Sequence, residues 1–377
     1  MSKMQKNLIT SRMPPVGPHQ NRRMGRNRSD NDDYTPVEWN KYFDKFQNLK
    51  VNGDTFRVYS AGEEGPVVFL LHGGGFSGLT WSLLAKKLIE MVVVRVVAMD
   101  IRGHGDTSTN DDSDLSIERL SSDVINVIKD MYGEDVPEII LMGHSMGGAI
   151  AVHVAASEQV PIAGLAMIDV VEGTAINALA SMQSFLRGRP QSFQSIEDAI
   201  KWSVHSGQLK NLESAKVSMP GQIKNATTGK TATLELENYT SKGVTSKKDE
   251  PVDSIREDEE ATFKLPGQKG QYVWRIDLRT SEPYWSGWFQ GLSQKFLNAK
   301  AGKILLLANI DRLDTDLTIG QMQGKFEMHT FDSTFTKCGH AVHEDLPQDV
   351  ANVITTFIVR NRLSVSKGEF SVHLAAC

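Results

Sequence analysis

The sequence predicts an α/β fold in which helices cover both faces of a mostly parallel sheet. Two observations predict it. Short apolar runs alternate with segments of helical periodicity, and several of these runs lack the polar alternation of a half-exposed strand. Strands that alternate with helices are joined by right-handed crossovers, which place the helices over the sheet. The predicted strands are Thr55–Ser60, Val67–Leu71, Val93–Met99, Glu138–Met142, Gly164–Ile168 and Ile304–Ala308.

The helices between and after these strands follow from the spacing of apolar residues. Spacings of three and four predict a helix over residues 117–131 and another over 350–358. An Ala-rich run over residues 148–156 predicts a third helix, directly after the strand that ends at residue 142. Residues 172–298 break the alternation with amphipathic segments and an aromatic cluster, so we expect them to form a helical cap over the site.

The sequence predicts one folded domain between two tails. Residues 1–35 contain several prolines and no apolar period, which predicts a disordered N-terminal tail. The folded domain is expected over residues 36–363, and residues 364–377 are expected to form a C-terminal tail. Within the cap, residues 224–264 hold nine acidic and seven basic residues. This composition predicts a disordered surface insertion.

The composition excludes several classes of protein. Lys plus Arg is 41 and Asp plus Glu is 46, giving a net charge of −5, which argues against nucleic acid as the main partner. Two cysteines, Cys338 and Cys377, are too few for a disulfide framework or a zinc cluster. No apolar stretch approaches the roughly 20 residues that span a bilayer. We therefore expect a cytoplasmic or nuclear protein with no membrane partner.

The strongest local signal for chemistry is the segment Gly143-His144-Ser145-Met146-Gly147. It fits the pattern G-x-S-x-G, the turn that presents a nucleophilic serine between a strand and a helix. The flanking segments support this interpretation, because a buried strand precedes the turn and an Ala-rich helix follows it. Glycines at the turn remove side chains that would clash there. We expect Ser145 to project at the carboxyl edge of the sheet.

A serine hydroxyl needs a base within hydrogen-bond reach. In this kind of fold the base is a histidine late in the chain. His340 lies in a loop between the strand-like segment 326–331 and the last helix, which is the expected position. His343 is near enough to compete, although it falls closer to the start of the helix. His329 belongs to the strand-like segment, and His205 to the surface of the cap.

The acid that orients the base has two candidate positions in the sequence. Asp169 ends the predicted strand Gly164–Ile168 and so lies at the carboxyl edge of the sheet. Asp311, Asp314 and Asp316 follow the strand Ile304–Ala308, which is the more usual place for this acid. The residues alone leave the two positions open.

The oxyanion of an acyl-transfer reaction needs backbone N–H donors. One should come from Met146, and a second from the glycine loop Leu71-His72-Gly73-Gly74-Gly75-Phe76, with Gly74 and Gly75 as the main candidates. The loop is no phosphate cradle, because neither G-x-G-x-x-G nor a Walker pattern is present. A second strand-end loop, residues 100–105, is expected to be structural.

Together these segments resemble the α/β-hydrolase superfamily, and more closely the type 2A protein phosphatase methylesterases. The resemblance extends from about residue 34 to residue 363. The segments that carry it are GHSMGGAIAVH (143–153), MIDVVEGTA (167–175), SFLRGRP (184–190), NLESAKVSM (211–219), YWSGWFQGLS (284–293), DRLDTDLTIGQMQGKF (311–326) and CGHAVHED (338–345). The insertion at 224–264 is longer and more acidic than this resemblance leads us to expect.

The resemblance implies an activity that spacing could not show. Members of this family hydrolyse the methyl ester on the C-terminal leucine of the phosphatase catalytic subunit, releasing methanol. The implied partner is therefore that subunit, free or in its scaffold-bound holoenzyme. The family's acid corresponds to Asp169, which completes a triad with Ser145 and His340. No metal or organic cofactor is implied. The alternatives are a carboxylesterase of broad specificity and a phosphatase-binding inhibitor whose esterase activity is secondary.

Overall fold

A computed structural model of the chain describes residues 32–243, 270–309, 313–331 and 338–368. Its centre is an eight-stranded sheet in the order β1-β2-β4-β3-β5-β6-β10-β11. The first two pairings are antiparallel, and all the others are parallel. The strands are β1 (Lys45–Val51), β2 (Asp54–Ala61), β3 (Val67–Leu71), β4 (Arg95–Met99), β5 (Ile139–His144), β6 (Ile162–Ile168), β10 (Gly302–Leu307) and β11 (Glu327–Thr330).

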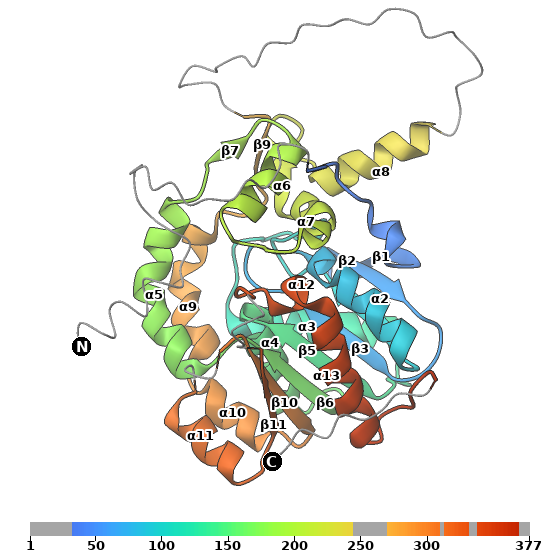
Figure 1. Cartoon of the computed structure of the whole chain (residues 1–377), viewed down its shortest axis with the longest axis vertical. Helices are drawn as coiled ribbons and strands as arrows, with labels where there is room; N and C mark the ends of the chain where they lie inside the picture. Colours follow the sequence, from blue (N-terminus) through green and yellow to red (C-terminus); the bar gives the residue numbers. More distant parts are fainter. Residues whose placement is uncertain (1–31, 244–269, 310–312, 332–337, 369–377) are drawn as a thin grey trace, which may run out of the picture.

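Helices cover both faces of the sheet, as the alternating pattern predicted. Figure 1 shows α2 (Ser82–Met91) and α13 (Pro347–Arg360) in front of it and α3 (Ile117–Tyr132) and α4 (Met146–Ser157) behind. Strand β3 shows how one segment supplies both layers. Phe69 and Leu71 pack with α3 and α4, whereas Val68 and Leu70 pack with α2 and α13. The two-residue period of a strand turns alternate side chains to opposite faces, so a central strand must be apolar throughout.

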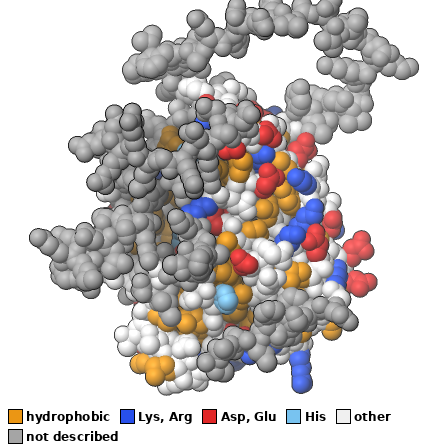
Figure 2. Space-filling model, in the orientation of Figure 1, with side chains coloured by type: hydrophobic (Ala, Val, Ile, Leu, Met, Phe, Trp, Pro, Cys, Tyr) orange, Lys and Arg blue, Asp and Glu red, His pale blue; other side chains and the backbone are white. Residues whose placement is uncertain are grey.

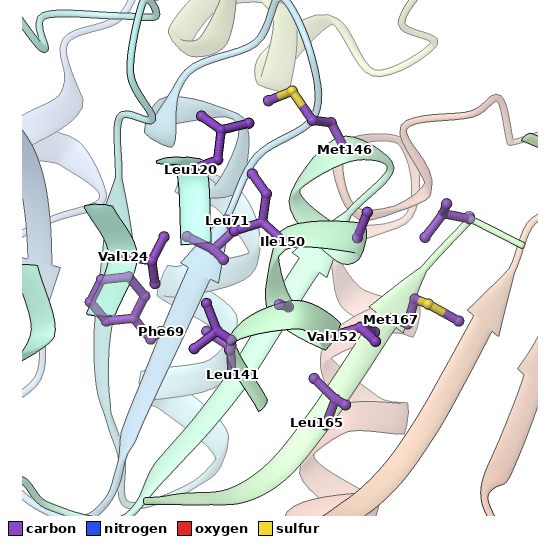
Figure 3. Packing of buried hydrophobic residues seen from close by; sticks show 14 of the residues in the cluster. Phe69, Leu71, Leu120, Val124, Leu141, Met146, Ile150, Val152, Leu165 and Met167 are labelled. Carbon is purple, nitrogen blue, oxygen red and sulfur yellow. The ribbon is translucent and has the colours of Figure 1, made fainter. Parts of the chain in front are cut away.

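The rear layer of the core is well filled next to the predicted nucleophile. Figure 3 shows Leu120 and Val124 of α3 and Ile150 of α4 meeting side chains of β3, β5 and β6. Met146 stands at the first turn of α4, above this layer. The buried apolar side chains of α3 recur at spacings of three and four residues, so they form one stripe of the helix that faces the sheet. The position of α4, and with it the preceding turn, is therefore held by packing along its length.

The segment between β6 and β10 forms the cap. Residues 172–187 and 282–298 lie along one side of the sheet (Figure 1). Residues 192–243 and 270–274 gather at one end of it and include a small antiparallel sheet in the order β7-β9-β8. They have a core of their own around Phe193, Met219 and Tyr272. The elements are α5 (Glu172–Arg187), β7 (Ser192–Phe193), α6 (Ile196–His205), α7 (Leu212–Ser218), β8 (Ile223–Asn225), α8 (Ala232–Gly243), β9 (Tyr272–Trp274), α9 (Glu282–Phe289) and α10 (Leu292–Asn298).

The prediction of a disordered insertion over residues 224–264 is wrong for its first half. Residues 223–243 form β8 and α8, and β8 pairs with β9. Glu237 of α8 forms an ion pair with buried Arg57 at 2.9 Å, and Thr231 donates a hydrogen bond to Asp106. A polar sequence can fold when its charged groups find buried partners, and composition alone does not show such partners. Residues 244–264 lie outside the described part.

The two predicted tails are described only in part. Residues 1–31 and 369–377 lie outside the described residues. At the N-terminal side, Asp33 forms an ion pair with Lys216 of α7 at 3.1 Å. At the C-terminal side, the Val93 N–H donates to Val365 O and the Lys367 N–H to Met91 O. Residues 364–367 therefore pair with the segment that joins α2 to β4.

Two further helices complete the fold near its C-terminal end: α11 (Thr315–Met322) and the short α12 (Val342–Asp345). Within the described ranges, no helix is long and apolar enough to cross a membrane. On the face shown in Figure 2, acidic and basic side chains are intermingled.

Candidate active site

The register of the sheet brings four strand ends together at one edge. Leu71 of β3 pairs with Met99 of β4 and with Gly143 of β5, and His144 pairs with Ile168 of β6. The residues that follow these strands therefore leave the sheet side by side. They are the glycine loop, the loop at residues 100–106, Ser145 and Asp169. Parallel strands place their carboxyl ends at one edge, which is where sites form in open α/β sheets.

Ser145 occupies the sharp turn between β5 and α4, with φ 53° and ψ −119°. This conformation is unfavourable for a residue with a side chain, and the surrounding structure must hold it. Glycines make the close packing possible. A Cβ atom on Gly147 would collide with the backbone carbonyl of Leu71, and one on Gly143 with that of Gly147. The turn thus presents the Ser145 hydroxyl at the N-terminus of α4, where the helix dipole favours negative charge.

Asp169 and His340 lie in contact at the same edge. His340 Nδ1 is 2.7 Å from Asp169 Oδ2, and the carboxylate also accepts the Ala308 N–H at 3.0 Å through Oδ1. Since a carboxylate can only accept, Nδ1 carries the proton, and the lone pair of Nε2 remains available as a base. Asp169 is fully buried, whereas the His340 side chain is 49% exposed. The acid is therefore fixed, and the base can reach a substrate.

The competing acids have other roles among the described residues. Asp314 caps α11 by accepting the Leu317 N–H, and it also accepts the Ser293 hydroxyl. Asp316 accepts a hydrogen bond from Gln294. Asp311 lies outside the described residues.

The competing histidines do not meet an acid at the edge of the sheet. His343 is fully buried, stacks against Trp81 and makes a hydrogen bond with the Thr80 hydroxyl at 2.9 Å. Its pKa is lowered well below the ordinary range, first by burial and then by neighbouring histidines. His329 lies in β11, and His205, at the end of α6 in the cap, makes a hydrogen bond with the hydroxyl of Tyr34 in the N-terminal segment.

His144 links the nucleophile turn to the loop of the base. It precedes Ser145 in the chain, and its Nε2 donates to the backbone carbonyl of His340 at 3.0 Å. The two imidazole rings lie 4.6 Å apart, centre to centre. Among the described residues, no hydrogen bond joins the Ser145 hydroxyl to His340. Catalytic hydrogen bonds are often long in a free enzyme and shorten when substrate binds.

The predicted oxyanion hole needs one correction. The Gly75 N–H, expected to face the oxyanion, donates to His104 Nε2 at 2.9 Å, and the Phe76 N–H donates to Gly73 O. Within the described chain, the amides of Gly74 and Met146 donate no hydrogen bond. The two residues are neighbours, because a Cβ atom on Gly74 would lie 3.8 Å from Met146 Sδ. The candidate oxyanion donors are therefore Gly74 and Met146, and Gly75 is excluded by its own partner.

Two buried histidines hold the glycine loop against the loop at residues 100–106. His72 donates from Nδ1 to Gly73 O at 2.8 Å and accepts the Ile101 N–H at Nε2 at 3.0 Å. His104 donates from Nδ1 to Arg102 O and accepts the Gly75 N–H. Each ring must be neutral to do this, because a charged imidazole has no lone pair to accept with.

Burial favours this neutral state. It lowers the pKa of His104 to about 4 and that of His72 well below the ordinary range. The loop at residues 100–106 is itself held by contacts in the core. Arg102, which is fully buried, forms ion pairs with Asp54 and Asp123, both at 2.6 Å. These contacts agree with the structural role expected for the loop. No motif marks His104 as the residue that holds the glycine loop, although its position after a strand end is a signal.

Two cap side chains near the glycine loop, Leu278 and Arg189, were not predicted as site residues, although Arg189 belongs to the segment SFLRGRP (184–190). A Cβ atom on Gly75 would lie 2.8 Å from Leu278 Cδ1 and 3.8 Å from Arg189 Nη1. Arg189 and Leu278 come from opposite ends of the cap segment, so only the fold brings their side chains together. Across the described chain, no group of three or more His, Cys, Asp or Glu side chains has the arrangement of a metal site.

A serine on a strained strand-to-helix turn, a histidine held by a buried aspartate, and the free amides of Gly74 and Met146 are the parts needed to cleave an ester through an acyl-enzyme. The class follows from the fold as well. The profile of the Alpha/beta hydrolase family matches residues 67–353. Two solved structures share the fold, a succinate-derivative hydrolase (TM-score 0.60, 16% identity, 84% of this chain and 99% of the other) and a thioesterase domain of the curacin pathway (TM-score 0.54, 20% identity, 82% and 98%). This chain is an α/β hydrolase.

The family within this class is defined by similarity over the whole chain. The protein phosphatase methylesterase 1 sequences of Mus musculus and Homo sapiens are each 46% identical to it, and both members of each pair are covered completely. A probable methylesterase of the same name from Caenorhabditis elegans is 42% identical over 88% of this chain and 79% of its own length. The chain belongs to the protein phosphatase methylesterases, which are carboxylic ester hydrolases, and the resemblance seen in its motifs is confirmed.

Proposed function

We propose that this chain removes the methyl ester from the C-terminal leucine of the type 2A protein phosphatase catalytic subunit. The contact that carries the proposal is the 2.7 Å pair between Asp169 and His340, beside a serine on the nucleophile turn. The similarity to protein phosphatase methylesterases supports the substrate. Fold alone would not, since α/β hydrolases cleave many kinds of ester. The partner is the catalytic subunit, either free or in its scaffold-bound holoenzyme.

The mechanism assigns one role to each side chain. His340 Nε2 takes the proton of the Ser145 hydroxyl as the oxygen attacks the ester carbonyl. The amides of Gly74 and Met146 bind the oxyanion that forms. The bond to the methoxy group then breaks, and His340 returns the proton so that methanol leaves. Water attacks the acyl-enzyme with His340 again as base, which releases the carboxylate and restores Ser145. Asp169 holds the imidazole in the required tautomer throughout.

Demethylation of the carboxymethylated phosphatase tests this function directly. Wild-type chain should release the methyl group, and Ser145→Ala should not. If the wild type leaves the methyl ester intact but cleaves a generic aryl ester in a Ser145-dependent reaction, the chain is a carboxylesterase of broader specificity. If Ser145→Ala still binds and inhibits the phosphatase while the wild type barely demethylates it, a binding function is the main one.

We further propose that the protein acts in the cytoplasm or the nucleus. The support is the composition alone, with only two cysteines and a mildly acidic charge balance. Fractionation of cells that produce the full chain, followed by detection in each fraction, tests it. Recovery in a secreted or membrane fraction would contradict the proposal.

A further inference from the structure

Arg189 is a cap residue that follows α5 and leads into β7. The central carbon of its guanidinium lies over the ring of Trp274, 3.5 Å from the ring centre, and 5.9 Å from the ring centre of Trp202. Trp274 is itself held, because its indole N–H donates to Pro190 O at 2.7 Å. Stacking on an aromatic face fixes the plane of a guanidinium without using its N–H donors. The cation is thus oriented, with its donors left for another group.

Arg189 has no acidic partner among the described residues. Burial alone lowers its pKa, to about 10, so it is charged at neutral pH, and its Nε is buried without a hydrogen-bond acceptor. Arg189 is partly buried, whereas the two fully buried arginines are neutralised within the fold: Arg57 by Asp106 and Glu237, and Arg102 by Asp54 and Asp123. A buried charge is costly unless it is paired. Arg189 therefore departs from the way this protein treats its buried cations.

The free end of the guanidinium reaches the glycine loop beside the nucleophile. Arg189 Nη1 would lie 3.8 Å from a Cβ atom on Gly75, which has φ 82° and needs to be glycine. The same loop supplies the unoccupied amide of Gly74, and a Cβ atom on Gly73 would lie 3.3 Å from Ser145 Cβ. The unpaired cation therefore lies next to the segment that receives the reacting ester.

We propose that Arg189 is a carboxylate-binding residue of this active site and anchors the acyl part of the substrate. The inference rests on the proposed function, in which the substrate is a methyl ester. The alcohol part of that ester is a single carbon, released as methanol. The rest of the bound molecule is then the peptide that carries the acyl group. A planar guanidinium can bind a carboxylate through two parallel N–H donors. That carboxylate has two sources: an acidic side chain near the ester, or the C-terminal carboxylate that hydrolysis produces.

Binding measurements with a protein that cannot turn over separate the two sources. The Ser145→Ala protein is titrated by calorimetry with four-residue peptides that end in leucine. In one arm, all peptides are C-terminal methyl esters, and Asp is compared with Asn at each of the three positions before the leucine. The other compares the C-terminal acid with the methyl ester in an otherwise neutral peptide. We expect one arm to show tighter binding of the carboxylate form by about 10- to 100-fold, the range of a charge-assisted hydrogen bond. Ser145→Ala/Arg189→Gln should lose that preference while neutral peptides bind as before.

Arg187 provides the matched control. It is exposed on the last turn of α5 and hydrogen-bonded to Gln183 and Ser184, so Arg187→Gln removes the same charge two residues away. This change should leave the carboxylate preference intact. Arg189→Lys, which keeps the charge but not the planar fork, should retain only part of it. If near-ultraviolet circular dichroism shows that Arg189→Gln fails to fold, the result with Arg189→Lys decides the question.

Three outcomes would overturn the inference: no peptide binds, neither arm shows a preference, or Arg189→Gln weakens neutral and carboxylate peptides equally. Each is distinguishable from a failure of the proposed function. If the proposed function fails, the wild-type chain leaves the methyl ester of the phosphatase in place. Failure of the Arg189 inference alone leaves demethylation intact and removes only the carboxylate preference.

Discussion

Single hydrogen bonds at the sheet edge decide which titratable groups can take part in catalysis. Asp169 holds the His340 imidazole through Nδ1, and His104 holds the Gly75 amide through Nε2. In both cases the partner on one ring nitrogen defines what the other nitrogen can do. The two histidines differ in exposure, because His104 is buried and His340 is half-exposed. One is therefore structural, and the other can exchange protons with a substrate.

Asp169→Asn should lower kcat by about three to four orders of magnitude. The amide cannot stabilise the imidazolium that forms, and it favours the wrong tautomer of the imidazole. Asp314→Asn should leave kcat nearly unchanged and alter stability by less than about 1 kcal/mol, because asparagine also caps helices. Steady-state kinetics on a methyl ester substrate compares the two. If Asp314→Asn proves the more damaging, Asp169 is not the acid.

The stability contributed by neutral His104 should be lost as the pH is lowered from about 6.5 to about 4. Burial lowers the pKa of His104 to about 4, whereas the unfolded chain binds that proton near pH 6.5. Between these pH values the unfolded state binds more protons than the folded state. The contribution of His104 to stability is therefore complete above pH about 6.5, the unfolded pKa, and is lost as the pH falls to about 4, the folded pKa. One such group accounts for about 3 kcal/mol. Denaturant unfolding of wild type and His104→Gln across this range measures it; parallel curves would contradict the assignment.

At the scale of elements, α8 shows how a polar segment becomes part of the fold. Glu237 reaches Arg57, whose guanidinium also lies 3.6 Å from Asp106. Glu235 accepts the Tyr272 hydroxyl at 2.7 Å, which ties α8 to β9. These contacts cross from the cap to the central sheet, because Arg57 lies in β2. The helix therefore contributes buried charge partners in addition to apolar surface.

Removing residues 230–260 should destabilise the protein, contrary to what a disordered insertion would imply. The deletion takes away α8 and leaves Arg57 with a single carboxylate. Glu237→Ala isolates this effect and should cost about 2–3 kcal/mol, since a buried charge loses a partner. Lys230→Ala, at an exposed position outside the helix, should change stability by less than about 0.5 kcal/mol. Thermal unfolding of all three variants tests this; an unchanged melting temperature in the deletion would contradict it.

At the scale of the whole molecule, the loop of the base connects the cap to the central sheet. Glu344 of α12 accepts hydrogen bonds from the Ser214 hydroxyl of α7, at 2.7 Å, and from the Thr80 hydroxyl. All three side chains are buried. Because α12 begins two residues after His340, this network links the cap to the segment that carries the base. The cap and the sheet should therefore unfold in one transition.

Glu344→Ala should weaken both the fold and the catalytic geometry. It leaves the hydroxyls of Thr80 and Ser214 buried without their acceptor, at a cost of about 2–4 kcal/mol. We also expect a lower kcat, because the segment that carries His340 loses its anchor. Calorimetric unfolding together with kinetics tests this. Two separate transitions in the wild type, or a variant with unchanged kcat, would contradict the coupling.

Local sterics and periodicity in the sequence determined most of the architecture. They predicted the strands β2 to β6 and β10, the strand-like segment that contains β11, the helices α3, α4 and α13, and the turn at Ser145, and the family match confirms the fold class. They missed β1 and the ordered first half of the insertion. Apolar periodicity and glycine turns are local sequence signals of strands, helices and turns. The half-exposed edge strand β1 and the charged helix α8 show little of either signal.

The sequence by itself determined the turn that carries Ser145 and the late loop that carries His340, because each depends on neighbours along the chain. Only the tertiary structure brought Asp169 to His340, since these residues are 171 positions apart. Among the described residues, it also decided that Gly74 rather than Gly75 has a free amide, and that Arg189 lacks a carboxylate partner. Hydrogen bonds and ion pairs between distant segments depend on sheet register and packing, which no local pattern records.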